Sequence, residues 1–209
     1  KKDILLTFDD GLKCQIKIIL PILEKYKIQS IFFIPTFKYF KLNSTLEAKR
    51  YFIYTKFKNI KNFYKIYFKR VFLSENKKKN FLKINKKKIS NFQKKYLFYS
   101  VDDIIFRLIR SKNLQKHNLI MKDIMRKFNF NEKSVAKKLL MDARDYKKLV
   151  KSKQHIGLHS DEHITSKTGL TYKKEFQNYF QNKEILNEFY KDINACSYPT
   201  NVYTKNSKK

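Results

Sequence analysis

The chain has 209 residues, of which 42% are hydrophobic and 16% aromatic, so it is long and apolar enough to form one substantial core. Its 3 Gly, 3 Pro and 2 distant Cys exclude a collagen-like protein, a Pro/Gly-rich linker, a disulfide scaffold and a multi-cysteine zinc finger. The net charge of +30, from 48 Lys and Arg against 18 Asp and Glu, would attract phosphates, anionic lipids or acidic glycans. Because Lys, Asn, Ile, Phe and Tyr are abundant along the whole chain, we interpret much of this charge as a composition bias.

The first 35 residues predict a strand, a helix and a second strand. The apolar run of residues 4–8 stops at Asp9-Asp10-Gly11, which is typical of a buried parallel strand that ends at an acidic turn. Apolar residues at helical spacing predict a helix over residues 14–26, which Pro21 would kink. Residues 30–34 predict another buried strand. Together they predict a βαβ unit, a parallel sheet and the α/β class.

The middle of the chain differs in composition and predicts an inserted, mainly helical segment over residues 41–145. This stretch has 29 Lys and Arg against 8 Asp and Glu, so +21 of the net charge lies in about half the length. Helical spacing is clearest over residues 51–72 and 101–109, and Asp102-Asp103 would open a helix at the end that its dipole favours for acids. Lys-rich residues 76–88 predict a solvated loop or a frayed helix face. We expect a single domain, 1–209, that contains this insertion.

After the insertion the alternation of strands and helices returns. Residues 146–151 should finish a helix, 155–159 predict a short strand, and Thr171 should cap a helix that runs to about Lys191. A last strand is predicted over residues 195–198, before Pro199.

The sequence does not determine the cellular compartment of the protein. No run approaches the roughly 18 apolar residues of a membrane-spanning helix, although the basic surface could touch an anionic membrane peripherally. The chain opens without Met or a signal peptide, and we expect truncation at its ends. The cytoplasm and the cell envelope are both compatible with this sequence, and the oligomeric state is undetermined.

Polar groups that could carry chemistry follow the predicted strands at residues 7–11, 159–163 and 197–200. Two adjacent carboxylates at a strand end repel each other unless a cation or a shared proton holds them. Two His four residues apart, with an aspartate, can form a facial ligand set for one ion. Taken singly, Asp-Gly is most often a turn and such a His pair is most often on the surface. Each of the three segments follows a strand-like run, and their occurrence together favours a hydrolytic metal site.

Two of these segments resemble a known enzyme family. Leu6-Thr7-Phe8-Asp9-Asp10-Gly11 and His159-Ser160-x-x-His163 resemble the first and second motifs of polysaccharide deacetylases with a NodB-like domain, carbohydrate esterase family four. The helix and strand over residues 145–159 also look like the family's approach to its second motif. The resemblance covers about residues 3–40 and 145–203. It implies a distorted (β/α) barrel of the NodB-like type, incomplete at the C-terminus and interrupted by the Lys-rich helical insertion.

The resemblance also implies an activity: a metal-dependent hydrolase acting on carbon–nitrogen bonds other than peptide bonds. Metal-bound water would attack the carbonyl of an N-acetyl, or less often O-acetyl, group on a polysaccharide or glycan precursor. Asp9 would be the general base, while Asp10, His159 and His163 would bind one divalent ion, commonly zinc in this family. Ser160 would support the second motif by hydrogen bonding within its loop. Tyr198 and Thr200 would lie on the oxyanion and substrate side of the site. Asn201 would occupy the position where the family often has glycine.

The sequence also departs from the family. The arginine that usually orients the base has no equivalent, because Ser197 and Tyr198 occupy that region. The later motifs, which supply an acetate pocket and a general-acid His, do not follow before Lys209. We interpret the remaining His117 and His155 as structural or surface residues.

Two alternatives remain open at this point. One is a truncated or inactive deacetylase-like module that binds glycans. The other, less favoured, is a basic nucleic-acid-binding protein, which the interleaved Lys and aromatic residues of the insertion suggest. Few Arg and no nucleic-acid-binding motif argue against specific nucleic-acid recognition. The expected partner is an acetylated glycan, whose identity the sequence does not give.

Overall fold

The computed structural model describes residues 4–37, 45–95, 97–164 and 169–205, and these fall into two compact units. The sheet unit contains Lys1–Thr45 and Lys133–Lys209, and the helical unit contains Leu46–Glu132. The insertion and single domain expected from composition stay predictions, and their boundary at residue 41 lies outside the described residues. Helix α9 (Ala143–Lys151) begins inside the range predicted for the insertion but belongs to the sheet unit.

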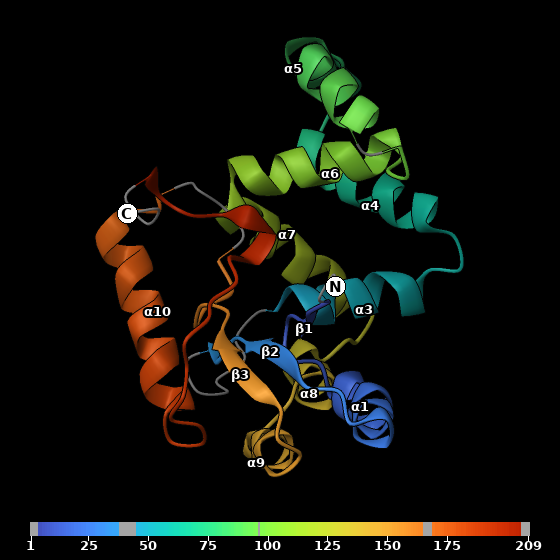
Figure 1. Ribbon diagram of the computed structural model, residues 1–209. Helices are drawn as coiled ribbons and strands as arrows, with labels where there is room; N and C mark the ends of the chain where they lie inside the picture. The colour runs from blue at the N-terminus through green and yellow to red at the C-terminus, as the bar shows by residue number, and fades with distance from the viewer. Residues whose placement is uncertain (1–3, 38–44, 96, 165–168, 206–209) are drawn as a thin grey trace. The chain divides into compact units, whose positions relative to one another are not determined.

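The sheet unit is built on a small parallel sheet (Figure 1). Its strands are β1 (Leu6–Phe8), β2 (Ser30–Ile34) and β3 (His155–Leu158), in the order β1-β2-β3. Parallel pairing of β1 with β2 agrees with the expected βαβ unit. Strand β3 then pairs with β2 from more than a hundred residues away, with His155 beside Ile31. The carboxyl ends of β1 and β3 therefore lie at the same edge of the sheet, where the polar segments follow.

The predicted (β/α) barrel is wrong. The described part of the chain forms three short parallel strands and is mainly helical, whereas such a barrel needs about eight strands closed on themselves. The run at 195–198 is not a strand, since it adds one isolated bridge, from Cys196 to Leu158 of β3. The resemblance implied a barrel, but this chain supplies too few strand-forming runs to close one.

Helices surround the sheet, with bounds close to those predicted. The predicted helix over 14–26 is a π-helical turn followed directly by α1, and Pro21, which has no backbone N–H to donate, lies where the helix changes type. Helix α10 starts after the Thr171 cap as predicted but ends at Leu186. The remaining bounds are η1 (Gln15–Ile19), α1 (Leu20–Tyr26), α8 (Glu132–Leu139), α10 (Tyr172–Leu186) and η2 (Pro199–Asn201).

The core of the sheet unit is small and tightly packed around β2 and β3. Phe32, Leu149 and Ile156 are at most 2% exposed. Gly157 of β3 is required by this packing, because a Cβ there would lie 2.5 Å from ring carbons of Phe33. The core fixes β3 closely against β2 and so fixes the loop that follows β3.

The helical unit consists of five helices, among the described residues, that join end to end through short turns. Ser100 and Asp103 form a capping box at the start of α6, which agrees with the expected acidic helix start. Of the two alternatives for residues 76–88, the solvated loop is wrong, because this stretch lies inside α5, where most of its side chains are exposed. The bounds are α3 (Leu46–Lys56), α4 (Ile60–Phe72), α5 (Glu75–Lys95), α6 (Val101–Lys112) and α7 (Leu114–Lys127).

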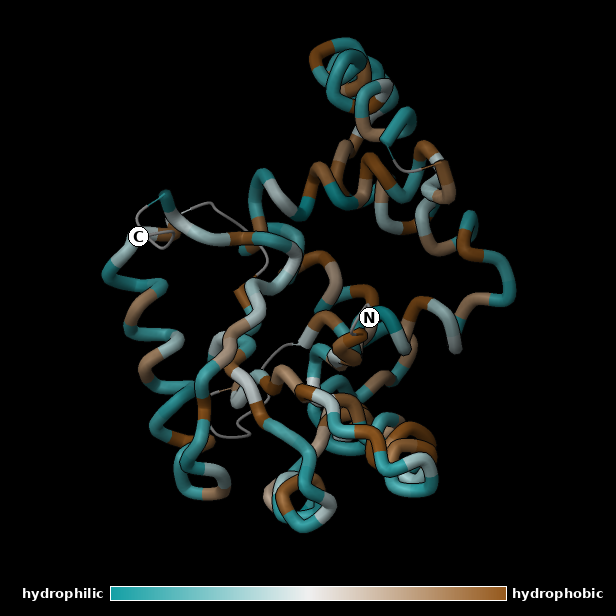
Figure 2. Tube along the Cα trace, in the orientation of Figure 1, coloured by the Kyte–Doolittle hydropathy of each residue, from teal (hydrophilic) through white to brown (hydrophobic). Residues whose placement is uncertain are grey.

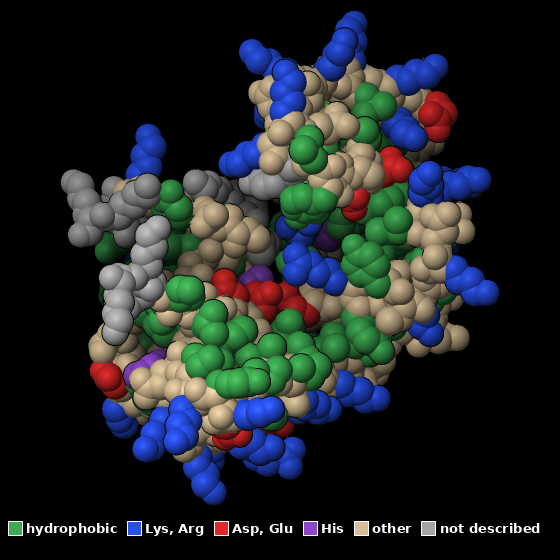
Figure 3. Space-filling view, turned by 45° about the vertical axis from the view of Figure 1, so that its right-hand side comes forward, with side chains coloured by type: hydrophobic (Ala, Val, Ile, Leu, Met, Phe, Trp, Pro, Cys, Tyr) green, Lys and Arg blue, Asp and Glu red, His purple; other side chains and the backbone are tan. Residues whose placement is uncertain are grey.

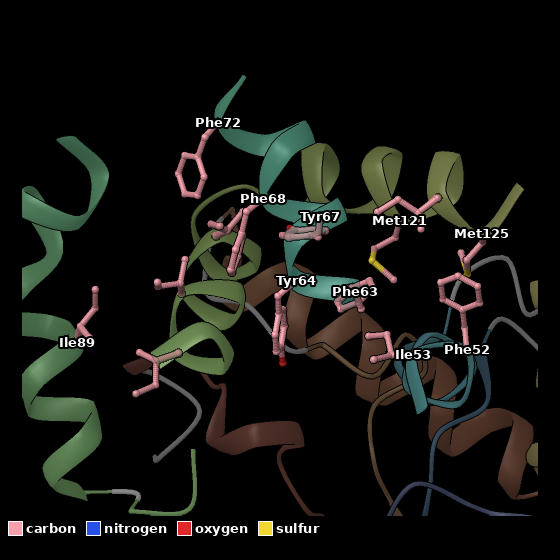
Figure 4. Close-up of a cluster of buried hydrophobic side chains, with 14 residues drawn as sticks. Phe52, Ile53, Phe63, Tyr64, Tyr67, Phe68, Phe72, Ile89, Met121 and Met125 are labelled. Carbon is pink, nitrogen blue, oxygen red and sulfur yellow. The ribbon is translucent and has the colours of Figure 1, made fainter. Parts of the chain in front are cut away.

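An aromatic core of its own stabilises the helical unit (Figure 4). Phe52, Phe63 and Tyr67 are fully buried, and Met121 and Met125 fill the space beside them. The hydropathy trace shows the matching pattern, with apolar and polar segments alternating along these helices (Figure 2). None of these core residues belongs to the cluster in the sheet unit, so each unit has a separate core.

The surface carries the positive charge that composition indicated. In the space-filling view, Lys and Arg side chains project at many places on the visible face instead of forming one patch (Figure 3). No helix in the described ranges has both the length and the apolar content to cross a membrane.

Candidate metal centre

The first part of the candidate site is the turn that ends β1. Asp10 has φ 74° and Gly11 has φ 60°, so the chain turns sharply through the left-handed region directly after Asp9. A Cβ on Gly11 would lie 3.2 Å from Cγ2 of Ile34, and a positive φ disfavours any larger residue there. This turn directs the carboxylate of Asp10 back over the edge of the sheet.

The second part is the loop that follows β3. His159 is 2% exposed and His163 is 8% exposed, and two residues of this loop, Ser160 and His163, also have positive φ, 65° and 49°. Left-handed backbone is uncommon for residues other than Gly, and it concentrates at functional sites. The strained loop brings both imidazoles to the same edge of the sheet as Asp10.

Asp10, His159 and His163 converge on one point. One ligand atom from each residue lies within 4.8 Å of the others. Oδ1 of Asp10 lies 2.8 Å from Nε2 of His163 and 3.3 Å from Nε2 of His159. The structure therefore brings together the three residues that the sequence predicted as metal ligands, from motifs on either side of the helical unit.

The charge of Asp10 is strongly stabilised. Its partial burial would by itself raise the pKa, but hydrogen bonds from His159 and His163, together with their positive charge when protonated, hold the pKa well below its ordinary value. Asp10 is thus an ionised carboxylate at neutral pH, which is the form that binds cations.

The orientation of His159 is fixed by a backbone carbonyl. Its Nδ1 lies 2.9 Å from the carbonyl oxygen of Ser197, which can accept but not donate a hydrogen bond. Nδ1 must therefore carry the proton, and in the neutral ring this leaves the lone pair on Nε2, beside Asp10. Metal-binding histidines in proteins are commonly held in this way by a second partner.

The other predicted ligand-loop residue, Ser160, is held by a helix and not by its own loop. Its fully buried hydroxyl donates to Oδ1 of Asn178 in α10, and the same oxygen accepts from the backbone N–H of Glu162 at 2.9 Å. Asn182, one turn further along α10, accepts from the backbone N–H of His159 at 2.9 Å. Two buried asparagines of one helix therefore hold the loop after β3 by hydrogen bonds.

Sequence reasoning missed these hydrogen bonds from α10 and a further one from Thr36. Thr36, just after β2, donates to Oδ1 of Asp161 at 2.6 Å, and Asn182 donates to Thr36 in turn. The signal available in the sequence was the pair of Asn178 and Asn182, four residues apart in a helix where buried positions usually hold apolar side chains.

Asp9, the predicted base, directly precedes Asp10, but its side chain makes other contacts. Its side chain is exposed, and its Oδ2 accepts a hydrogen bond from the Ser197 hydroxyl at 3.2 Å. Its backbone carbonyl accepts from the amide of Gln15 at 2.6 Å. Ser197 thus contacts both motifs, with its hydroxyl on Asp9 and its carbonyl on His159, in the region where the family arginine has no counterpart.

Tyr198 and Thr200, the predicted oxyanion and substrate residues, lie in the segment after Ser197. Thr200 and Asn201 have φ 53° and 55°, and the N–H of Thr200 donates to no carbonyl among the described backbone bonds. Tyr198 packs against the rings of Tyr179 and Tyr203, and burial raises its pKa. No contact places either residue directly on the three convergent ligands within the described part of the chain.

The two remaining histidines lie away from this group. His155 is exposed on β3 and its Nδ1 lies 2.9 Å from the hydroxyl of Tyr190. His117 is 1% exposed in the core of the helical unit, and burial together with Lys49 and Arg110 lowers its pKa to about 3.

The donor set fits a divalent transition metal. Two imidazole nitrogens and one carboxylate oxygen, with ligand atoms already within 4.8 Å of one another, match the facial arrangement that leaves coordination positions open. The same three residues can hold one ion with only small shifts, because their loops are fixed by Ser197, Asn178 and Asn182.

Residues 1–46 match the family model described as polysaccharide deacetylase. The matched stretch contains Asp9 and Asp10, whereas His159 and His163 lie outside it. It is a short part of the chain, and it supports a hydrolase of the deacetylase kind in general terms. No curated protein and no solved structure matches this chain.

Proposed function

We propose that this chain is a metal-dependent hydrolase that removes acetyl groups from a glycan, the kind of activity suggested by the family match over residues 1–46. The observation that carries the proposal is the convergence of Asp10, His159 and His163, although Asp10 and His159 are 149 residues apart. A chance turn and a chance surface His pair would not meet on one carboxylate oxygen.

In this proposal Asp10, His159 and His163 hold one divalent ion, with zinc as the expected metal. When bound, the ion polarises the acetyl carbonyl and lowers the pKa of a water molecule to near neutrality. Asp10 contributes its negative charge, and His159 presents Nε2 because Ser197 holds the proton on Nδ1.

Asp9 acts as the general base. Its exposed carboxylate is accessible to a water or a substrate, and the Ser197 hydroxyl restricts its orientation from one side. A carboxylate within hydrogen-bond reach of the attacking water can take its proton as the new bond to carbon forms. The N–H of Thr200, which has no carbonyl acceptor in the described structure, is the proposed donor to the developing oxyanion.

The substrate is an acetylated glycan, and the scissile bond is the amide of an N-acetyl sugar or, less often, an O-acetyl ester. Acetate is the product, together with the free amine or hydroxyl.

The first test measures bound metal and acetate release in the same preparations. The full chain is loaded with zinc, dialysed and assayed for metal content, and then incubated with N-acetylglucosamine oligomers. We expect about one zinc per chain and acetate release in the wild type, loss of both in Asp10→Ala and His159→Ala, and retained metal without turnover in Asp9→Asn.

His155→Gln is the matched control, because His155 begins the strand that precedes His159 but lies outside the ligand group. It should keep both the metal and the activity. A folded wild type that holds no metal would overturn the proposal, and one that holds metal and binds oligomers without releasing acetate would replace it with a glycan-binding module.

A further inference from the structure

The helical unit contains a pocket that the proposed hydrolase does not use. The pocket lies between α3, α4, α6 and α7 and has a volume of about 60 Å³. Every lining residue belongs to Leu46–Glu132, so the pocket is a property of this unit alone. Because one ordered water needs roughly 10–15 Å³ by this measure, the space admits several waters or one small polyatomic ion.

Positive charge is concentrated in this pocket. Lys49, Arg50, Arg107 and Arg110 line it, and Asp103 is the only acidic lining residue. The chain is strongly biased toward Lys and has 6 Arg among its 48 basic residues, so half of its arginines line one small pocket. Arg differs from Lys in presenting a planar fork of donors that matches phosphate and carboxylate oxygens.

The acidic groups nearby are largely engaged elsewhere. Asp103 accepts hydrogen bonds from the hydroxyls of Tyr64 and Ser100 and from the Ser100 backbone N–H. Glu132 lies 4.0 Å from the ammonium group of Lys49, which also donates to Asn118 at 2.8 Å. These contacts engage Lys49 and the cap of α6. Asp103 also attracts Arg107, but no acidic side chain forms an ion pair with any of the three arginines in the described part of the chain.

The guanidinium groups have few protein acceptors. The side chains of Arg50 and Arg110 make no hydrogen bond and no ion pair within the described residues, and Arg107 lies over the ring of Tyr99, 4.0 Å from its centroid. Glu47 is the one further carboxylate that attracts Arg110, and its two oxygens are buried without a hydrogen-bond partner in the described structure. Arg110 is therefore attracted by one buried carboxylate without forming an ion pair with it, and most donors of the three guanidinium groups are unused within the described residues.

These arginines also repel one another. Burial, followed by the charges of Arg107 and Arg50, lowers the pKa of Arg110 to about 10. Arg110 still carries its proton at neutral pH, so the repulsion persists in the folded protein. An anion between the three groups would remove it and would use their free donors.

A neutral ring completes the lining. The hydroxyl of Tyr67 lies 2.8 Å from Nδ1 of His117, and both residues are buried. His117 lines the pocket, and because burial lowers its pKa to about 3, it adds no positive charge there at neutral pH.

We propose that this pocket binds a phosphate group, as a free dianion or as the terminal phosphate of a small ester, with Arg110, Arg107 and Arg50 as its main ligands. A tetrahedral dianion can accept from three guanidinium groups at once, whereas a carboxylate has two oxygens and one charge. The pocket is lined on several sides by four helices, so it takes one compact anion and not the continuous backbone of a nucleic acid.

The test compares anions and charge-matched variants on the full chain. Inorganic phosphate, methyl phosphate and acetate are titrated calorimetrically at constant ionic strength, because a net charge of +30 attracts any anion weakly. We expect phosphate to bind at least tenfold more tightly than acetate, and Arg110→Gln to weaken phosphate binding by tenfold or more. If methyl phosphate binds as tightly as phosphate, the ligand class is a phosphate ester. If the pocket excludes methyl phosphate, the ligand is the free ion.

Arg126→Gln is the control, because it removes the same charge from an exposed position in the same unit, outside the pocket. It should change phosphate affinity less than twofold. Equal losses in Arg126→Gln and Arg110→Gln, or equal affinities for acetate and phosphate, would overturn the proposal. Arg50→Gln is a second test in case the Arg110 variant misfolds, since Arg50 is exposed. We expect it to weaken phosphate binding at least threefold while the circular dichroism spectrum stays unchanged.

Discussion

Ser197 contacts the candidate site through two different atoms. Its carbonyl oxygen accepts from Nδ1 of His159, and its hydroxyl donates to Asp9. The first contact belongs to the backbone and survives any substitution, whereas the second depends on the side chain. The two proposed tasks of this site, metal binding and proton transfer, can therefore be separated at one residue.

Ser197→Ala should lower the turnover number for acetate release while leaving the metal content unchanged. A hydrogen bond of this kind contributes about 0.5–1.5 kcal/mol, so we expect a loss of roughly two- to tenfold. Steady-state kinetics and metal analysis check this together. Ser152→Ala, which removes an exposed hydroxyl that donates to Glu24, is the control and should change neither quantity.

The sequence was sufficient to single out the three residues that converge but not what holds them. Asp10, His159 and His163 could be predicted because each follows a strand-like run and parallel strands end at a common edge. The carbonyl of Ser197 could not, since any residue has one. Asn178 and Asn182 act across the fold on a loop about twenty residues earlier, and no local pattern links the two segments.

At the scale of single elements, β3 depends on the absence of a side chain at Gly157. A Cβ there would lie 2.5 Å from the Phe33 ring and 3.1 Å from the carbonyl oxygen of Ala195. Gly157→Ala should therefore lower the free energy of unfolding by about 1–3 kcal/mol, as overpacking does elsewhere. Chemical denaturation followed by circular dichroism measures this.

A substitution of Phe33 tests whether overlap with its ring causes the expected loss of stability in Gly157→Ala. If overlap with the ring is the cause, Phe33→Leu should relieve it, and the double variant should lose less stability than the sum of the two single variants. Additive losses would show instead that Gly157 is required for another reason.

Strands and helices could be predicted with unequal success, for identifiable reasons. β2 and β3 are short apolar runs bounded by turns, and their predicted bounds are close to those observed. β1 was expected to be buried over residues 4–8, but it spans only Leu6–Phe8 and is largely exposed, because no further strand pairs with it among the described residues. The many Lys of α5 predict solvated charge on a loop or a frayed helix face, yet Lys is a good helix former and Ile89 supplies a buried contact. The barrel was expected from the resemblance alone, and the described chain lacks the strands to form it.

At the scale of the whole molecule, the two separate cores have consequences for unfolding. Phe63 belongs to the cluster of the helical unit and Leu149 to that of the sheet unit, and both are fully buried. Truncating either to Ala should cost about 2–5 kcal/mol in the unit that contains it.

We expect urea unfolding to show two steps, with Phe63→Ala shifting one midpoint and Leu149→Ala the other. Far-ultraviolet circular dichroism reports on both units, and loss of bound metal reports on the sheet unit. A single transition that both variants shift equally would show that the two units unfold as one cooperative body.

The Lys49–Glu132 contact has a consequence for the order in which the chain folds. Strand β3 must find β2 across more than a hundred residues, and the entropy of closing so long a loop opposes that pairing. Lys49 and Glu132 lie near the first and last residues of the helical unit, and their charged atoms are 4.0 Å apart. Once that unit has folded, its two ends are already neighbours, and the segment left to close is short. His159 and His163, in the loop after β3, can then reach Asp10 without a long random search.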